Sequence, residues 1–417
     1  MTNEINNTTI KSPKNSIVPN GWEVSLLDSL AKRGSGHTPD KEFEEYYNGG
    51  IKWVSLADSN RLDNGLIYET KIEISALGIK NSSAVLHPAG TVLLSRDAGV
   101  GKSAVMGIEM AVSQHFIVWR CKEGILDNWF LYYWLQFKKE YFERQAVGST
   151  IKTIGLPLFK KLKIKHPKYQ EQIAISKLLR LMDNAISQNN QLIIQKELRK
   201  KGLMQNLLTG KKRLNGFIDD WKKYEMKDLF RHLKGQLLSK DKLENEGTYK
   251  CILYGELFTT YNEVIIQVKS KTNCYVGTPS QYGDILMPGS TTTTGIDLAV
   301  TSTILEDGVL IGGDINIFRK ENDLTDPVFM SYFLTNTQKR NILPMTQGVT
   351  IIHIYGGELM ELKFEIPSID EQSAIAQVLQ AADKEIQLLK AKTEKLREQK
   401  KGMMQVLLTG KKRLKIN

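Results

Sequence analysis

The sequence has few of the residue types that mark disulfide-bonded, metal-binding and membrane proteins. Its 417 residues include three widely spaced cysteines, which excludes a disulfide framework and a cysteine-rich metal site. The six histidines form no ligand spacing such as His-x-x-x-His. No apolar run approaches the ~18 residues of a membrane-spanning helix, and the polar first residues do not form a signal peptide. We therefore expect a reduced, cytoplasmic, soluble protein that binds neither metal nor membrane.

The motifs of nucleotide- and cofactor-dependent enzymes are also missing. The segment Arg96–Ser103 ends like a phosphate-binding P-loop, but Arg96 stands where that loop needs a small residue. No Gly-x-Gly-x-x-Gly follows a strand, and no Asn/Asp-Pro-Pro-Tyr/Phe tetrapeptide occurs. Pro39-Asp40 with Glu69-Thr70-Lys71 matches a nuclease pattern, but that pattern is permissive enough to occur by chance. We predict a chain with no catalytic residue and no cofactor of its own.

An internal repeat organises the chain. Leu207–Leu214 recurs letter for letter as Leu407–Leu414, and 27 of the 67 positions that align residues 148–214 with 348–414 are identical. The segment before each copy is longer and more divergent, and it mixes apolar runs with turn-rich stretches. Strands are expected at Gly90–Leu94, Gly283–Met287 and Val309–Ile311. The predicted order is a flexible tail (1–16), a first variable domain (17–167), a central helical region (168–214), a second variable domain (215–367) and a C-terminal helical region (368–417).

The repeated segments predict two long helices. Pro167 and Pro367 precede them, and Gly210 and Gly410 stand where a helix ends. Stepping alternately four and three residues gives an apolar seam of about 33 residues, or roughly 50 Å, in each copy. The seam residues are Ile175, Leu179, Met182, Ile186, Asn189, Ile193, Leu203, Leu207, Ile375, Leu379, Ala382, Ile386, Leu389, Leu396, Met403 and Leu407.

We predict an α+β fold in which two mixed α/β domains alternate with two long helices. The helices are expected to pair as an antiparallel coiled coil, which gives the chain a pseudo-twofold internal repeat. The alternative is that each helix packs only on its own domain. Two divergent domains on one rigid spacer suit a ligand that is contacted at two separate points, such as double-stranded DNA.

Several short motifs resemble those of the specificity subunits of type I restriction–modification systems. The twice-occurring Glu-Gln (171–172, 371–372) and Leu-Leu-Thr-Gly-Lys-Lys-Arg-Leu carry the resemblance in the helical regions. In the first variable domain it rests on the segments 34–39, 95–97, 114–116 and 148–151. In the second, Pro288–Thr294 replaces the Ser-Arg-Asp stretch, so the family's DNA contacts carry over less readily there.

The resemblance implies a non-catalytic subunit whose variable domains are target-recognition domains, each reading one half of an asymmetric bipartite DNA site. It also implies partners: two modification (methyltransferase) subunits and restriction (translocase/endonuclease) subunits, which would carry S-adenosylmethionine, ATP and magnesium. The alternatives are a free-standing sequence-specific DNA-binding regulator and a self-contained nuclease. The regulator would bind DNA tightly without partners, whereas the nuclease would cut DNA by itself in the presence of magnesium.

Basic and polar residues in the predicted loops are the candidates for DNA contact. In the first domain they are Arg33, Ser35, His37, Thr38, Lys52, Arg96, Lys102 and Lys152; in the second they are Lys234, Gln236, Lys240, Lys250, Thr291, Thr292, Arg319 and Gln347. For each one alone, an ordinary surface role is the alternative, and Arg96 could simply pair with Asp97.

The net charge of +11 is unevenly distributed. Residues 168–214 and 370–417 carry +7 and +5, whereas residues 1–167 carry +4 and residues 215–369 carry −5. The basic charge therefore lies mainly in the helical regions. We expect the isolated chain to bind DNA weakly and to lose that binding readily as salt rises.

Overall fold

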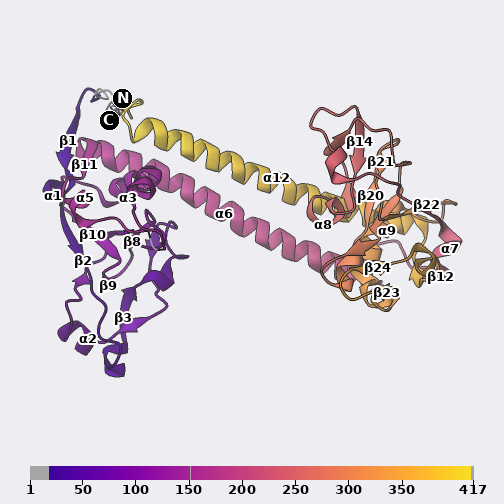
Figure 1. Cartoon of the computed structure of the whole chain (residues 1–417), viewed down its shortest axis with the longest axis horizontal. Coiled ribbons are helices and arrows are strands. Elements are labelled where there is room, and N and C mark those ends of the chain that lie inside the picture. The colour runs from indigo at the N-terminus through magenta and orange to yellow at the C-terminus, as the bar shows by residue number, and fades with distance from the viewer. Residues whose placement is uncertain (1–17, 151, 415–417) are drawn as a thin grey trace, which may run out of the picture. The chain divides into compact units, whose positions relative to one another are not determined.

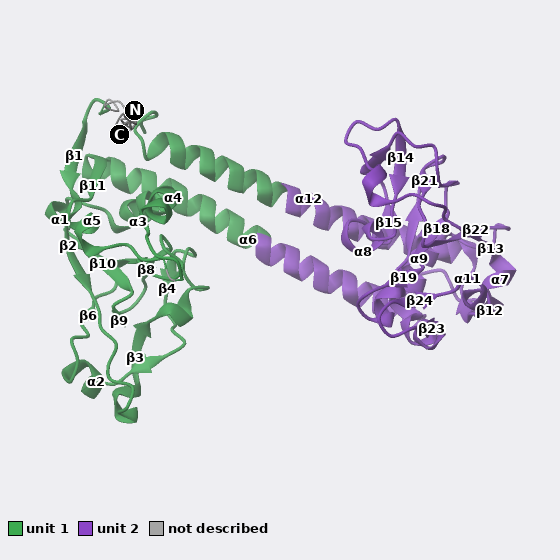
Figure 2. Ribbon diagram, viewed as in Figure 1, with its two compact units in different colours: residues 1–189, 392–417 green, residues 190–391 purple. Residues whose placement is uncertain are grey.

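The computed structural model describes residues 18–150 and 152–414, and the predicted N-terminal tail (1–16) lies outside them. The chain divides into two compact units, which Figure 2 distinguishes by colour. Unit 1 consists of residues 1–189 with 392–417, and unit 2 consists of residues 190–391. Each unit therefore contains one variable domain, called the first or second head below, and a part of each long helix.

The first head is a mixed α/β domain built on two sheets. A five-stranded sheet has the order β2-β10-β7-β8-β4, a four-stranded sheet has the order β5-β3-β9-β6, and β1 pairs with β11. The strands are β1 (Trp22–Leu26), β2 (Ala31–Ser35), β3 (Tyr47–Val54), β4 (Leu66–Ile67), β5 (Glu73–Ile74), β6 (Leu86–His87), β7 (Val92–Ser95), β8 (Ser103–Met106), β9 (Met110–Val112), β10 (Phe116–Cys121) and β11 (Lys163–Pro167). The helices are α1 (Leu27–Leu30), α2 (Ala76–Lys80), α3 (Asn128–Phe137), α4 (Lys139–Gln145) and α5 (Leu156–Lys160).

The second head follows the same plan. Its five-stranded sheet has the order β13-β22-β18-β20-β15, and β12 pairs with β25 as β1 pairs with β11. A four-stranded sheet, β16-β14-β21-β17, and a three-stranded sheet, β19-β24-β23, complete it. The strands are β12 (Lys222–Glu225), β13 (Phe230–Lys234), β14 (Tyr249–Ile252), β15 (Val264–Ile265), β16 (Ser270–Thr272), β17 (Thr278–Pro279), β18 (Ile285–Pro288), β19 (Ser290–Thr291), β20 (Ser302–Ile304), β21 (Leu310–Ile311), β22 (Ile315–Lys320), β23 (Thr346–Gln347), β24 (Ile352–Ile354) and β25 (Lys363–Ile366). The helices are α7 (Met226–Leu229), α8 (Glu256–Thr259), α9 (Pro327–Thr337), α10 (Lys339–Ile342) and α11 (Gly356–Leu359).

The three strands expected from the sequence are present with shifted ends. They are β7, β18 and β21, each of which begins one or two residues later than predicted. Their side chains are buried throughout, so these strands read as continuous apolar runs without the period-two alternation of a half-exposed strand.

The core of each head extends onto the long helices. In unit 1, buried residues of β10 and α3 form one apolar cluster with Leu179 and Leu407. In unit 2, the matching cluster joins β22 and α9 to Leu379 and Leu207. Helices α3 and α9 are apolar on nearly every side because most of their residues lie inside these clusters.

The two long helices are α6 (Tyr169–Leu207) and α12 (Ile369–Leu407), as the proline and glycine positions predicted (Figure 1). Gly210 and Gly410, just beyond their ends, have φ angles of 67° and 71°. Glycine reaches this left-handed conformation without a Cβ clash, which suits it to end a helix. None of the described helices combines the length and apolarity needed to cross a membrane.

The predicted seam residues lie on the less exposed side of these helices, with one exception. Met403 is 37% exposed, whereas its neighbour Met404 packs against the apolar cluster of unit 1. The buried seam residues are Ile175, Leu179, Met182, Ile193, Leu207, Ile375, Leu379, Ile386 and Leu407, and the half-buried ones are Ile186, Asn189, Leu203, Ala382, Leu389 and Leu396. Leu203, the counterpart of Met403, is half-buried and packs against the cluster of unit 2, so the two copies differ at this position.

Ion pairs link α6 to α12 within each unit. In unit 1, Lys400 donates to the carboxylate of Asp183. In unit 2, Lys196 lies 2.5 Å from Glu385, Lys390 lies 2.7 Å from Glu197, and Lys200 lies 2.7 Å from Asp383. Lys196, Lys200 and Lys400 stand at polar positions of the four-and-three spacing itself.

Candidate nucleic-acid interface

In the first head, the loop that follows β7 carries Arg96 and is held on both sides by main-chain hydrogen bonds. The Arg96 N–H donates to the carbonyl of His115 at 2.9 Å, and the Arg96 carbonyl accepts from Ile154 N–H at 2.9 Å. A bridge between Asp97 and Thr153 adds a further contact. The first loop cluster, defined as residues 95–102, His115, 147–150 and 152–154, thus joins three segments that are distant in sequence.

In the second head, the loop that follows β18 is held in the same way. Gly289 N–H donates to the carbonyl of Asp314 at 2.6 Å, and the Gly289 carbonyl accepts from Ile354 N–H at 2.9 Å. Ser290 and Thr291 form β19 and pair with β24. The second loop cluster, defined as residues 289–298, Asp314 and residues 346–354, therefore occupies the equivalent position, with Gly289 matching Arg96.

Side chains of the first loop cluster converge on Asp97, which is 8% exposed. One carboxylate oxygen lies 2.7 Å from His115 Nδ1, and the other lies 3.6 Å from Arg96 Nε. The Ser95 hydroxyl donates to the Asp97 carbonyl at 2.6 Å. The 3.6 Å separation is an ion pair without a hydrogen bond.

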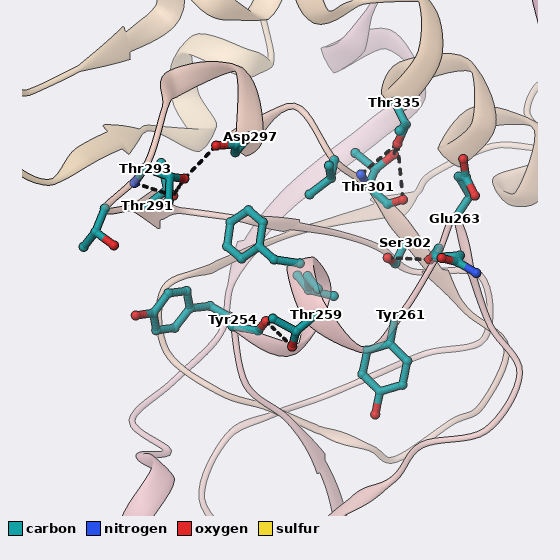
Figure 3. A pocket seen from close by; sticks show the side chains of 16 residues that line it. Tyr254, Thr259, Tyr261, Glu263, Thr291, Thr293, Asp297, Thr301, Ser302 and Thr335 are labelled. Atoms are coloured by element: carbon teal, nitrogen blue, oxygen red, sulfur yellow. Dashed lines mark hydrogen bonds between the residues drawn. The ribbon is translucent and has the colours of Figure 1, made fainter. Parts of the chain in front are cut away.

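The second loop cluster uses hydroxyl groups around two carboxylates. Ser290 donates to the carboxylate of Asp314, and Thr294 donates to Asp297 Oδ2 at 2.8 Å. Thr293 donates to the same oxygen at 2.6 Å (Figure 3). These hydroxyl hydrogen bonds lower the pKa of Asp297. The loop is therefore neutral or acidic at the place where the first head has an arginine.

An open cavity of about 580 Å³ lies beside the threonine loop of the second head. Figure 3 shows Tyr254 and Thr259 on one side of it and Thr291, Thr293 and Asp297 on another. Aromatic and hydroxyl side chains both line the cavity. The surface near the second loop cluster is thus hollow, with few positive charges.

The predicted DNA-contact residues fall into three groups. Charged residues in ion pairs are Arg33 with Asp28, Lys52 with Glu69 and Glu73, Lys250 with Glu306, and Arg319 with Asp284. Residues whose side chains make other hydrogen bonds are Ser35, Thr38, Lys102, Thr291 and Gln347. Exposed residues are His37, Lys152, Lys234, Gln236, Lys240 and Thr292, and Arg96 is half-buried.

Only some of these candidates come together. Ser35 donates to the carbonyl of Phe116, and Thr38 donates to Gln114, so both lie beside the first loop cluster with Arg96. In the second head, Thr291 and Gln347 belong to the three-stranded sheet of the second loop cluster. Other candidates, such as Lys250 on β14, lie on other parts of their head.

Asp97, His115, Asp297 and Asp314 were not among the predicted residues, although they order the loop clusters. Two of them precede a strand directly, because β10 begins at Phe116 and β22 at Ile315. A carboxylate or imidazole side chain directly before a buried apolar strand is the sequence feature that could have identified His115 and Asp314. Among the described residues, no group of three or more His, Cys, Asp or Glu side chains is arranged to hold a metal ion.

The Glu-Gln motif joins each head to a long helix. Gln172 Oε1 accepts from Asp127 N–H at 2.9 Å, and its Nε2 donates to the carbonyls of Ile125 and Pro167 at 3.0 Å. Gln372 makes the same three contacts with Asp326, Leu324 and Pro367, at 2.9, 3.0 and 2.8 Å. The buried glutamines therefore bind the main chain that enters α3 or α9, and their contacts extend well beyond their own turn.

The repeated arginines form ion pairs with the buried glutamates of the Glu-Gln motif. Arg413 donates twice to Glu171, at 2.7 and 2.6 Å, and Arg213 donates twice to Glu371, at 2.6 and 2.5 Å. The glutamate side chains are only 3% and 1% exposed. Hydrogen bonding to Glu371 raises the pKa of Arg213, which is therefore charged at neutral pH.

Two heads with one sheet plan, the same contacts to the long helices and different loop clusters define a two-headed recognition protein. A family model described as the type I restriction modification DNA specificity domain matches residues 19–198 and again residues 218–398. The chain belongs to this family.

Curated relatives and solved structures agree with this assignment. The MjaVIII specificity subunit of Methanocaldococcus jannaschii is 25% identical over 95% of this chain and 94% of its own length, and the putative MjaX specificity subunit of the same organism is 25% identical over 95% of each. The crystal structure of a type I restriction–modification S subunit from M. genitalium has a TM-score of 0.59 at 15% identity and covers 97% of this chain and 99% of its own. The HsdS subunit from Thermoanaerobacter tengcongensis has a TM-score of 0.52 at 16% identity, covering 95% and 99%. At these identities the solved structures support the fold.

The protein is accordingly the non-catalytic DNA-recognition subunit of a type I restriction–modification complex. The prediction of a specificity subunit is confirmed. Neither the free-standing regulator nor the self-contained nuclease is favoured by these matches.

Proposed function

We propose that this subunit reads an asymmetric, bipartite double-stranded DNA site, one half with each head. The observation that carries the proposal is the contrast between equivalent loop clusters: Arg96, Asp97 and His115 in the first head are replaced by Gly289, Ser290 and Asp314 in the second. Loops at the same place on the same sheet plan present different chemical groups. Different groups at equivalent positions select different bases.

The two long helices act in this proposal as the spacer between the half-sites. They pair as an antiparallel coiled coil, supported within unit 1 by Lys400 with Asp183 and within unit 2 by Lys200 with Asp383. Lys200 is the repeat counterpart of Lys400, and Asp383 is the repeat counterpart of Asp183. The arrangement is therefore pseudo-twofold. The proposed domain bounds remain 17–167 and 215–367 for the heads, with 168–214 and 368–417 for the helical regions.

The repeated helical regions also dock two modification subunits, to which restriction subunits are added. Identical surfaces serve identical partners, and Lys211 and Lys212 recur as the exposed pair Lys411 and Lys412. Methylation and cleavage then belong to the partners, which supply S-adenosylmethionine, ATP and magnesium. Such a complex works on DNA in the cytoplasm.

Exchange of the first head tests the proposal. Residues 17–167 are replaced by the corresponding head of another family member with a known half-site, and the chimera is expressed with its modification subunits in a host without other adenine methylation. Mapping of methylated adenines should show one half-site changed and the other retained. Changes in both halves, or in neither, would contradict the one-head, one-half-site arrangement.

A further inference from the structure

We propose that Arg96 selects one base pair of the first half-site, a G·C pair, and that Asp97 and His115 are positioning residues for its guanidinium. This inference rests on the proposed function, since it assumes that the first head reads half of the site. It assigns a role to one side chain and to the pair that holds it.

The backbone of Arg96 is fixed more firmly than that of an ordinary surface loop. Its N–H and C=O are bonded to His115 and Ile154, two segments on either side of it. The loop then turns through Ala98, Gly99 and Gly101, which have φ angles of 32°, 103° and 85°. Gly101 N–H closes the turn on the Ser95 carbonyl at 3.0 Å. A fixed Cα allows a long side chain to reach one defined place.

Asp97 makes its close side-chain contact with His115 and only a longer ion pair with Arg96. Its Oδ2 is 2.7 Å from His115 Nδ1, whereas its Oδ1, 3.6 Å from Arg96 Nε, makes no hydrogen bond with the described residues. The negative charge of the carboxylate therefore orients the Nε end of the Arg96 guanidinium, and none of the guanidinium N–H groups donates a hydrogen bond to it. The Arg96 side chain is 20% exposed.

Comparison with other arginines of the heads separates Arg96 from a structural residue. Arg319 donates to Asp284 at 2.8 and 2.6 Å and to the Pro279 carbonyl, and Arg33 donates to both oxygens of Asp28 at 3.0 and 3.1 Å. Hydrogen bonding to Asp284 raises the pKa of Arg319, and the pair is buried. Arg319 thus uses Nε and one terminal nitrogen, and Arg33 uses Nε alone, whereas the Arg96 side chain makes no hydrogen bond within the described chain.

The free fork has a specific chemical match. Guanine presents two acceptors, N7 and O6, at the spacing of two guanidinium N–H groups, and this is the commonest specific contact between proteins and DNA bases. In the second head, the equivalent Gly289 has no side chain, and a Cβ there would come within 3.0 Å of Asp314. The second half-site is therefore read without an arginine at this position. The side-chain contact between Ser290 and Asp314 nevertheless joins the loop to the start of β22, as the contact between Asp97 and His115 joins the loop to the start of β10.

Methylation mapping with the whole subunit tests the assignment. Wild type, Arg96→Ala and Arg96→Lys are co-expressed with the modification subunits, and methylated adenines are mapped by long-read sequencing. Discrimination at one G·C pair of the first half-site should fall by roughly 10- to 100-fold in both variants, because Lys keeps the charge but lacks the fork. The second half-site should not change. Arg120→Ala, an exposed residue at the far end of β10, is the matched control and should keep the full motif.

The positioning pair is tested by Asp97→Asn and His115→Asn, each alone and combined with Arg96→Ala. Each single variant should relax the same base pair by about 3- to 10-fold, and neither should relax it further once Arg96 is absent, as expected for coupled residues. Relaxation of other base pairs, or additive losses, would overturn the positioning role. If Arg96→Ala lowers methylation uniformly with no relaxed base, Arg96 contacts phosphate and the assignment is wrong. A wild type that methylates no bipartite motif would instead contradict the proposed function.

Discussion

The two units have the same side-chain contacts where a head joins the long helices, but they have different side chains in the loop clusters. At the junctions, unit 1 and unit 2 repeat the glutamine contacts and the arginine–glutamate pairs. In the loop clusters, the fold is the same but the side chains are not, and Arg96 of the first head corresponds to Gly289 of the second. The two copies have thus kept the chemistry that joins a head to the helices and changed the chemistry that meets the ligand.

A third repeated junction contains a tyrosine, an aspartate and a lysine. Tyr133 donates to Asp183 at 2.7 Å, and Lys400 bonds the same carboxylate and lies 5.3 Å from the Tyr133 ring centroid. Tyr332, Asp383 and Lys200 repeat the set. Burial, and then the neighbouring carboxylate, raises the pKa of Tyr133. Both tyrosines are therefore hydrogen-bond donors at any physiological pH.

The largest expected effect comes from the arginines that pair with the buried glutamates Glu171 and Glu371. Arg213→Ala and Arg413→Ala each leave a buried glutamate without its partner, so each should lower the free energy of unfolding by about 3 kcal/mol. Thermal denaturation, with hydrogen exchange to assign the loss to unit 2 or unit 1, measures this. The exposed Arg231→Ala serves as the control and should change stability by less than about 0.5 kcal/mol. A large loss for one pair and none for the other would break the equivalence of the junctions.

A smaller and unequal effect is expected at the lysines. Lys200 has two carboxylate partners, Asp383 at 2.7 Å and Glu263 at 3.6 Å, whereas the matching Lys400 has Asp183. Lys200→Met should cost about 1–2 kcal/mol and Lys400→Met about 1 kcal/mol, since both sites are partly exposed. Urea denaturation followed separately in each unit by hydrogen exchange gives the two values. A greater loss for Lys400→Met would show that Glu263 contributes nothing.

The smallest effect is a difference in acid sensitivity between the heads. Burial lowers the pKa of His87 from its ordinary value of 6.5. The unfolded chain then takes up this proton at a higher pH than the folded chain, so His87 costs no stability above about pH 6.5 and lowers it as the pH falls below that value. In the second head, the strand equivalent to β6 is β17, and it carries Pro279, which does not titrate, where β6 carries His87.

Comparison of wild type with His87→Gln between pH 7 and 5.5 measures this effect in unit 1. The variant should lose less stability on acidification, by under about 1 kcal/mol because the ring is partly solvated. Glu225 of unit 2 provides the contrast: hydrogen bonds from Lys227 and Lys363 lower its pKa to about 2. Its contribution is present above its unfolded value of 4.5 and is lost only as the pH falls toward 2. An equal pH response of wild type and variant would remove His87 as the cause.

Much of the architecture was predictable because it is recorded in local patterns. The proline and glycine positions bracketed α6 and α12, and the repeat indicated two heads of one plan. Of the predicted seam residues, Met403 is exposed while its counterpart Leu203 is half-buried. A periodic pattern does not show where a helix changes its packing partner.

The candidate interface was predictable only as a set of residues. Arg33, Arg96 and Arg319 look alike in sequence, as basic residues in or beside apolar runs. Their partners lie 5, 1 and 35 positions away, and nothing local distinguishes a closed bidentate pair from an ion pair at 3.6 Å. Pairing geometry is decided by which strands become neighbours.

The sequence by itself determined the family, the duplicated plan, the long helices and the absence of catalytic motifs, because each of these depends on spacing and identity along the chain. Only the tertiary structure decided that Gln172 and Gln372 bind the entrances of α3 and α9, and that Arg96 matches Gly289. Those facts depend on hydrogen bonds between segments far apart in the chain, such as those from Arg96 to His115 and Ile154, which lie 19 and 58 residues away. Such bonds form only when the sheets have brought the segments together.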